Sequence, residues 1–143
     1  PWYIQQQKLE NITNLESELM QSQKSGILGL KLTDEEQFIW AAALYEGEGC
    51  LSYYEKTNKW SFVIQMTDKD VIDHLAEVFS LNVNVTKRNA PAHWKKSWVA
   101  RTSARSKIFG IVCEIYPYLG ARRREKCDKF LQWYAAKEGL KYD

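Results

Sequence analysis

The chain has 143 residues, of which 45% are hydrophobic and 27% charged, so one domain with a packed core is expected and wholesale disorder is disfavoured. The longest unbroken apolar run, residues 38–45, is too short to span a bilayer. The net charge of +2 hides a segregation of charge. Residues 1–85 hold 6 Lys or Arg against 13 Asp or Glu, whereas residues 86–126 hold 11 against 2. This basic stretch faces either a polyanion or solvent.

The first 30 residues differ from the rest of the chain. They are rich in Gln, and their apolar side chains recur at intervals of three and four, which predicts an amphipathic helix. The residues in this pattern are Leu9, Ile12, Leu15 and Leu19. We therefore expect residues 1–32 to form a helical extension and residues 33–143 to form the folded domain.

The domain is predicted to begin with a helix and a pair of strands. Thr33 and Glu36 have the spacing of a capping box, and the helix that they start is expected to end near Gly47. Residues 50–56 and residues 59–66 then alternate between apolar and polar side chains, as half-buried strands do. The short connection between them indicates a β-hairpin.

A second helix and a second pair of strands follow. Thr67 or Asp68 can cap the helix. Residues 81–86 and residues 97–102 alternate in the manner of strands, with a basic loop between them. This half of the domain is therefore expected to repeat the order of the first half, a helix followed by two strands.

Two more helical patterns close the chain, the first ending near Pro117 and the second near Gly139. Consecutive strands without a crossover helix pair antiparallel. We therefore predict an α+β fold in which the helices cover one face of an antiparallel sheet.

If the helices cover the apolar side of the strands, the opposite face is polar. Its side chains resemble a set of base and phosphate contacts, although a polar face is also common in two-layer folds that bind nothing there. The predicted DNA-binding residues are Ser52, Tyr54, Lys56, Lys59, Ser61, Gln65, Thr86, Arg88, Lys95, Ser97 and Arg101.

The most specific stretch is residues 41–49, which read Ala-Ala-Ala-Leu-Tyr-Glu-Gly-Glu-Gly. The alanines let another helix approach closely, and the glycines free the backbone for a sharp helix-to-strand turn. Glu46 and Glu48 lie at the C-terminal end of the helix, where the macrodipole disfavours negative charge, which suggests a compensating cation. Carboxylates without a neighbouring His or Cys suit Mg²⁺ or Ca²⁺ rather than zinc.

This stretch resembles the nonapeptide that names the LAGLIDADG homing endonuclease family, in the acidic variant that ends Glu-Gly-Glu-Gly. Residues 65–70 are similar to the family's end of the second strand and start of the middle helix. Residues 117–119, followed by three arginines, are similar to its run into the C-terminal helix. The resemblance covers roughly residues 33–137. It implies an αββαββα fold whose antiparallel sheet is saddle-shaped.

Only one such motif occurs, and single-motif members of the family pair as homodimers across their motif helices. The resemblance therefore implies an interface that contains Ala42, Ala43 and Glu46. Ala43 stands where the family usually has Gly, which is expected to hold the paired helices slightly apart. Glu46 is also expected to accept hydrogen bonds at the end of its own helix.

The resemblance also implies a catalytic centre. Glu48 and the backbone carbonyl of Gly47 would bind the catalytic Mg²⁺, and Ca²⁺ would support binding without cleavage. Asp68 matches a position near the attacking water. Arg122 falls where a basic residue stabilises the charge of the transition state. The alternatives for this cation are Arg123 and Arg124.

The leading hypothesis is an intron-homing enzyme that cuts both strands of DNA at a long pseudo-palindromic site and depends on Mg²⁺. The alternative is a catalytically silent nucleic-acid-binding protein on the same fold, either an intron-RNA maturase or a DNA-binding regulator. A glycosidase built on Glu46 and Glu48 is disfavoured, because residues two apart across a Gly turn seldom face each other at the required separation. No membrane partner is expected.

The three cysteines are far apart and odd in number, which argues against a disulfide framework and for a reducing compartment. They are Cys50, Cys113 and Cys127. A chloroplast or mitochondrion, bacterial cytoplasm and phage-infected cytoplasm all fit this expectation. Nothing at the start of the given sequence reads as a secretory signal peptide.

Overall fold

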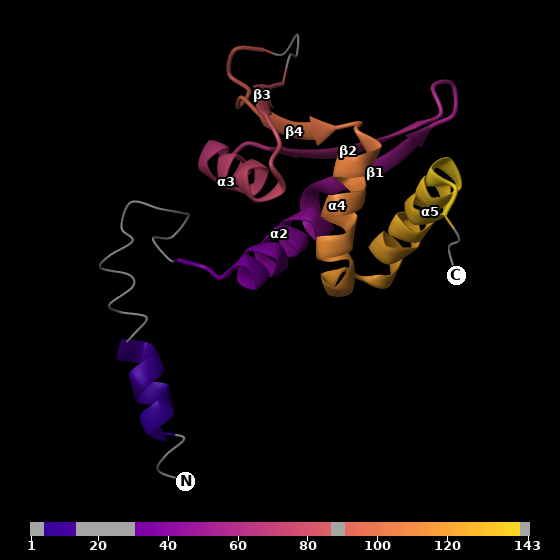
Figure 1. The fold of residues 1–143 in the computed structure, drawn as a ribbon. Coiled ribbons are helices and arrows are strands. Elements are labelled where there is room, and N and C mark those ends of the chain that lie inside the picture. Colours follow the sequence, from indigo (N-terminus) through magenta and orange to yellow (C-terminus); the bar gives the residue numbers. More distant parts are fainter. Residues whose placement is uncertain (1–4, 14–30, 87–90, 141–143) are drawn as a thin grey trace. The chain divides into compact units, whose positions relative to one another are not determined.

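The structure is a computed structural model that describes residues 5–13, 31–86 and 91–140 (Figure 1). The chain divides into two units, Pro1–Thr33 and Asp34–Asp143.

In the first unit, residues 5–13 form a helix whose Leu9 and Ile12 are exposed. The predicted continuation of this helix through Leu15 and Leu19 lies outside the described residues.

The second unit begins with the helix and hairpin that the sequence predicts. Helix α2 spans Asp34–Glu48 and passes directly into strand β1, Gly49–Tyr54, which pairs antiparallel with strand β2, Lys59–Met66. Asn58 closes the hairpin with a φ of 50°, a left-handed conformation that Asn tolerates better than most residues. In this register Leu51 lies opposite Phe62, so both side chains enter the core.

The second half of the sheet is built in the same way. Helix α3, Lys69–Phe79, leads to strand β3, Val83–Val85, which pairs with strand β4, Trp98–Thr102. Strand β4 also pairs with β2, so the sheet has the order β1-β2-β4-β3 and every pairing is antiparallel. Strand β3 is shorter than predicted and ends before Thr86.

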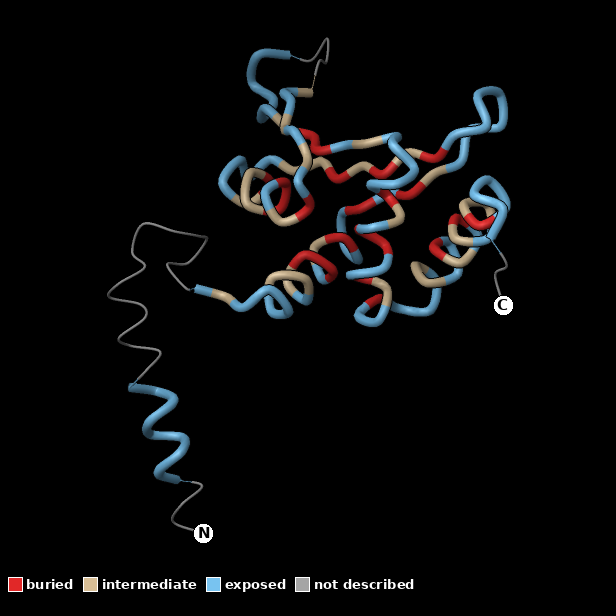
Figure 2. The backbone as a smooth tube through the Cα atoms, viewed as in Figure 1, coloured by how far each residue is buried: buried red, intermediate tan, exposed pale blue. Residues whose placement is uncertain are grey.

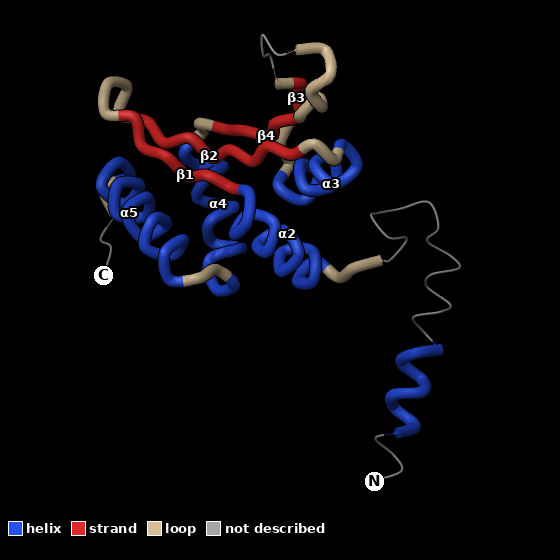
Figure 3. Tube along the Cα trace, turned by 180° about the vertical axis from the view of Figure 1, so that it is seen from behind, coloured by secondary structure: helices blue, strands red, loops and turns tan. Residues whose placement is uncertain are grey.

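Helix α4, Arg105–Ile115, runs into a short 3₁₀ turn, Tyr116–Tyr118, which is followed by helix α5, Ala121–Glu138. Figures 1 and 3 show α2, α3, α4 and α5 on the same side of the sheet. The predicted α+β fold, with an antiparallel sheet and helices on one face, is confirmed, and so is the predicted pair of closing helices.

Burial follows the predicted alternation along β2, where Trp60, Phe62 and Ile64 are buried between residues that are not (Figure 2). These side chains pack against the helices, and both α3 and α4 contact this strand. Among the described residues, none of the helices combines the length and the apolar character that crossing a membrane requires.

Candidate functional site

The junction between α2 and β1 has no connecting loop, because the helix ends at Glu48 and the strand begins at Gly49. The ring of Tyr45 lies directly against Gly49 and occupies the space that a Cβ atom would need. The same ring stacks on Phe62 at a centroid distance of 5.1 Å and an interplanar angle of 7°. Gly49 is therefore required by close packing, and the buried Tyr45 ring fixes where the helix meets the sheet.

Glu46 faces α5. Its Oε2 atom accepts a hydrogen bond from the backbone N–H of Gly120, the N-cap residue of α5, at 3.1 Å. Its backbone carbonyl accepts two more from the Arg123 guanidinium, at 3.1 and 3.3 Å. That guanidinium also lies over the ring of Tyr45, 5.4 Å from its centroid. The expectation that Glu46 accepts hydrogen bonds at a helix end is met, because it joins the end of α2 to the start of α5.

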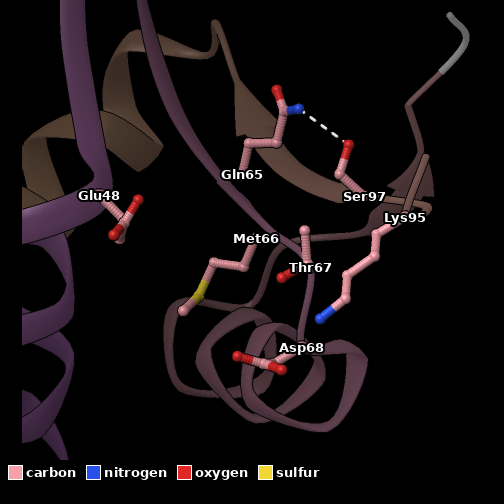
Figure 4. A pocket seen from close by; sticks show the side chains of 7 residues that line it. All are labelled: Glu48, Gln65, Met66, Thr67, Asp68, Lys95 and Ser97. Carbon is pink, nitrogen blue, oxygen red and sulfur yellow. Dashed lines mark hydrogen bonds between the residues drawn. The ribbon is translucent and has the colours of Figure 1, made fainter. Parts of the chain in front are cut away.

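Glu48, two residues further along, is exposed and contributes to a cavity of about 480 Å³. The other residues around this cavity come from the end of β2, the start of α3 and the segment before β4 (Figure 4). The complete lining consists of Glu48, Gln65, Met66, Thr67, Asp68, Lys95 and Ser97. We call this cavity the carboxylate pocket.

Asp68 is the N-cap residue of α3, one of the two capping positions that the sequence predicts. Its backbone carbonyl accepts the N–H of Ile72 at 3.1 Å, but its side chain makes no capping hydrogen bond. The Asp68 carboxylate therefore lines the carboxylate pocket together with Glu48. The structure thus brings together two acidic residues that are 20 positions apart in the sequence.

Lys95 enters the carboxylate pocket from the opposite side. In Figure 4 its ammonium group points toward Thr67 and Asp68, and the hydrogen bond from Gln65 Nε2 to Ser97 Oγ, 2.9 Å long, lies beside it. The sequence predicts Lys95 only as a DNA contact. Its place beside Asp68 could not be read from the sequence, because residues 87–96 carry no periodic pattern that would fix their path.

The three consecutive arginines at the start of α5 have different environments. Arg123 binds Glu46, and Arg124 donates to the carbonyls of Tyr116 and Pro117 at 3.2 and 2.6 Å. Arg122 is exposed, and within the described part of the chain its side chain makes no hydrogen bond or ion pair. Of the three, Arg122 is the one that can reach a ligand without breaking a contact of the fold. It does not line the carboxylate pocket.

The donor chemistry of the carboxylate pocket fits a hard divalent cation. Glu48 and Asp68 offer carboxylate oxygens, and Thr67 and Gln65 offer a hydroxyl and an amide oxygen. No group of three or more His, Cys, Asp or Glu side chains that could hold a metal is found in the described segments.

The polar face of the sheet contains most of the predicted DNA-binding residues. Ser52 pairs with Ser61 and Tyr54 with Lys59, and the neighbouring Leu51, Trp60 and Phe62 are buried. Arg101 of β4 is exposed and lies opposite Val63. A polar surface therefore runs along β1, β2 and β4 on the side away from the helices.

Other predicted DNA contacts lie elsewhere. Lys56 belongs to the hairpin turn rather than to a strand, and Arg88 lies outside the described residues. Thr86 is half-buried, its hydroxyl oxygen is buried, and a DNA contact there stays a prediction. The strand ends at Val85, one residue earlier than predicted.

The predicted dimer interface needs a correction. Ala42 has no exposed surface and belongs to the hydrophobic core, on a helix that contacts both α3 and α4, so it cannot contact a second subunit in this conformation. Ala43 is exposed, and Ile39 and Gly47, four residues to either side of it, are exposed as well. Nothing lies within 4 Å of the position that a Cβ atom would take at Gly47.

No protein-family model matches the chain, and no curated protein matches it. Solved structures of homing endonucleases do. A structure of I-CvuI in complex with its target in the presence of Ca matches with a TM-score of 0.52 and 17% sequence identity, covering 69% of this chain and 66% of that one. A structure of I-CvuI with the I-CreI target in the presence of Mg gives the same values.

The group I intron-encoded homing endonuclease I-CeuI, complexed with DNA, matches with a TM-score of 0.57 and 15% identity, covering 93% of this chain and 70% of that one. The match to I-CvuI spans slightly less than two thirds of the I-CvuI chain. Identities this low establish the fold and leave function to be argued from the site. The chain therefore has the fold of the LAGLIDADG homing endonucleases, as the nonapeptide at residues 41–49 predicts.

Proposed function

We propose that this protein is a site-specific endonuclease that cuts both strands of DNA and depends on Mg²⁺. The observation that carries the proposal is the carboxylate pocket, whose lining includes Glu48 at the end of α2, Asp68 at the start of α3 and Lys95. The solved structures that share the fold are homing endonucleases in complex with DNA, which supports the same partner for this chain.

Glu48, with the Gly47 carbonyl, is proposed to hold Mg²⁺. When bound, the cation would polarise the scissile phosphate and lower the pKa of a water molecule. Asp68 would orient that water and accept its proton. Lys95 and Arg122 would offset the negative charge that develops on the phosphate, Lys95 from inside the pocket and Arg122 from the surface of α5.

The polar face of the sheet would bind the duplex. Strand β2 has 8 residues and therefore reaches about 27 Å, which matches roughly eight base pairs of duplex DNA. Ser61 and Gln65 would read base edges, and Lys59 and Arg101 would bind phosphates or guanine.

A second copy of the chain would pack on the exposed face of α2. Ile39 is 44% exposed, and Ala43 and Gly47 continue its row at four-residue intervals. Ala43 and Gly47 are small enough to let two α2 helices approach closely and bring two copies of Glu48 near a two-fold axis. The site on DNA would then be a pseudo-palindrome, in keeping with the symmetry of the dimer.

The decisive experiment selects bound duplexes from a random pool in Ca²⁺ and then incubates the selected duplexes with the protein in Mg²⁺. We expect a long, two-fold-related consensus and cleavage of both strands within it. Glu48→Gln should bind the same duplexes without cutting them. Cleavage by Glu48→Gln at the wild-type rate would contradict the assignment of the carboxylate pocket.

The same experiment distinguishes the nuclease from the alternative function, a catalytically silent nucleic-acid-binding protein. A two-fold-related consensus without cleavage in Mg²⁺ would favour a catalytically silent DNA-binding regulator. Failure to select any duplex, together with binding to the host intron RNA, would favour a maturase. Either result would overturn the nuclease proposal while leaving the fold as described.

A further inference from the structure

A second cavity, of about 340 Å³, lies where the β1–β2 hairpin turn, the start of α4 and the last turns of α5 meet. It shares no residue with the carboxylate pocket. Its lining consists of Thr57, Asn58, Lys59, Ser103, Arg105, Trp133 and Lys137. We call it the basic pocket, because three of these seven residues are cationic and none is acidic.

The walls of the basic pocket are held together by the side chain of Asn58. Its amide oxygen accepts hydrogen bonds from the Tyr53 hydroxyl and, at 3.0 Å, from the indole N–H of Trp133. These bonds connect the hairpin turn to α5, and they leave the amide NH₂ as the group of Asn58 that can donate to a ligand. The pocket is therefore defined by contacts between elements that are far apart in the sequence.

Two cations of the basic pocket, Lys137 and Arg105, keep N–H donors free for a ligand. Lys137 lies 5.8 Å from the centroid of the Trp133 ring, which orients its ammonium without neutralising it. Arg105 forms an ion pair with Glu138, to which its Nε donates at 2.8 Å, and this contact leaves the two Nη groups of the guanidinium for another acceptor. Arg105 is also the first residue of α4, whose first turn contains no acidic residue and has no side-chain cap.

We propose that the basic pocket binds a phosphate group, and that this group belongs to the backbone of duplex DNA. Guanidinium, ammonium, hydroxyl and amide donors surround the cavity, and phosphate oxygens accept from all four. Lys59 lines this pocket and is also the first residue of β2, where the polar face of the sheet ends at the hairpin turn. A duplex that extends beyond that end of the sheet would pass the pocket.

The chemistry of the basic pocket is independent of the proposed nuclease activity, whereas the assignment to DNA rests on the proposed DNA-binding function. Two experimental arms separate the two claims. In the first, inorganic phosphate is titrated into the full-length protein while the backbone amide resonances are followed by NMR. We expect saturable shifts at Ser103, Arg105 and Lys137, and weaker binding in Lys137→Gln. A titration without shifts at these amides would overturn the proposal.

The second arm measures binding to a duplex of random sequence in Ca²⁺ at several salt concentrations. Lys137→Gln removes one cation of the pocket. Its matched control is Lys129→Gln on the same helix, which does not line the pocket. The logarithm of the DNA association constant falls linearly with the logarithm of the salt concentration. The magnitude of this negative slope should decrease by about 0.9 for Lys137→Gln and stay unchanged for Lys129→Gln.

Equal slopes for the two variants would overturn the assignment to DNA even if inorganic phosphate binds, and the pocket would then serve a free phosphate. Arg105→Gln is a second variant, in case Lys137→Gln alters the packing of Trp133, and it should lower the slope in the same way. Absence of cleavage in Mg²⁺ would contradict the nuclease proposal without changing either slope, so the two failures are distinguishable.

Discussion

The two acidic residues at the end of α2 show how differently one helix can use the same functional group. Glu46 faces α5 and is bound to the N-cap of that helix, whereas Glu48 faces the carboxylate pocket and makes no contact of that kind. An α-helix turns by about 100° per residue, so two positions separate their directions by roughly 200°. The helix therefore presents one carboxylate to the fold and the other to a ligand.

The largest expected effect is on cleavage by Glu48→Gln. If Glu48 holds the catalytic cation, its loss should slow DNA cleavage by at least about 100-fold, because the site then loses its main charge for the metal. Stability should be unchanged or slightly higher, because removing a negative charge at the C-terminal end of a helix is favourable. Single-turnover cleavage and urea unfolding measure the two quantities. Reduced stability together with normal cleavage would reverse the roles of Glu46 and Glu48.

A smaller effect is expected for Lys95→Gln. Loss of the ammonium beside Asp68 should slow single-turnover cleavage by about 10-fold, which corresponds to about 1.4 kcal/mol of transition-state stabilisation. The neighbouring Lys96 is exposed and does not line the carboxylate pocket, so Lys96→Gln is the matched control. Both variants should lose similar DNA affinity. If Lys95→Gln cuts as fast as Lys96→Gln, Lys95 is only a DNA contact.

Glu46→Ala tests the structural role of Glu46, the acidic residue of α2 that is bound to α5. It removes the acceptor for the Gly120 N–H, and we expect the free energy of unfolding to fall by about 1 kcal/mol. Cleavage by the folded protein should change much less than in Glu48→Gln. Urea denaturation followed by circular dichroism provides the measurement. An unfolding free energy equal to that of the wild type would show that the contact between α2 and α5 does not depend on this side chain.

The smallest expected effect is on the reactivity of the Cys127 thiol, which reports on the contact between α2 and α5. Cys127 lies fully buried on α5, and burial raises the pKa of its thiol to about 11. Because the raised pKa keeps the thiol protonated at pH 8, Cys127 should react slowly with a disulfide reagent, and faster as the pH rises. Cys50 is exposed and should react quickly. Glu46→Ala should accelerate the reaction of Cys127, and equal rates in both proteins would argue against local opening of this contact.

The sequence predicts the order of the elements and most of their ends correctly, because each depends on local pattern. Alternation between polar and apolar residues locates β2, and Gly139 ends α5 with a φ of 67°. The prediction that Glu48 lies at the end of the motif helix also depends only on the local sequence pattern. These features need no knowledge of how distant segments pack.

Features that depend on packing between distant segments could not be predicted. The partner of Glu46 is 74 residues away, and the position of Lys95 depends on the path of an aperiodic loop. Ala42 is buried in the hydrophobic core, and a helical pattern alone does not show which small residues of α2 face the core and which face solvent. The basic pocket combines residues from three elements, so no single stretch of sequence indicates it.

The direct passage from α2 into β1 has a consequence for how this protein can be altered. Since no loop separates Glu48 from Gly49, and the Tyr45 ring fills the space beside Gly49, the backbone that carries Glu48 cannot be moved without shifting the hydrophobic core. Inserting a single residue at this junction would reverse the inward and outward faces of β1 as well as displacing the acid. Efforts to retarget the protein to new sequences are therefore better directed at the exposed side chains of the sheet than at this junction.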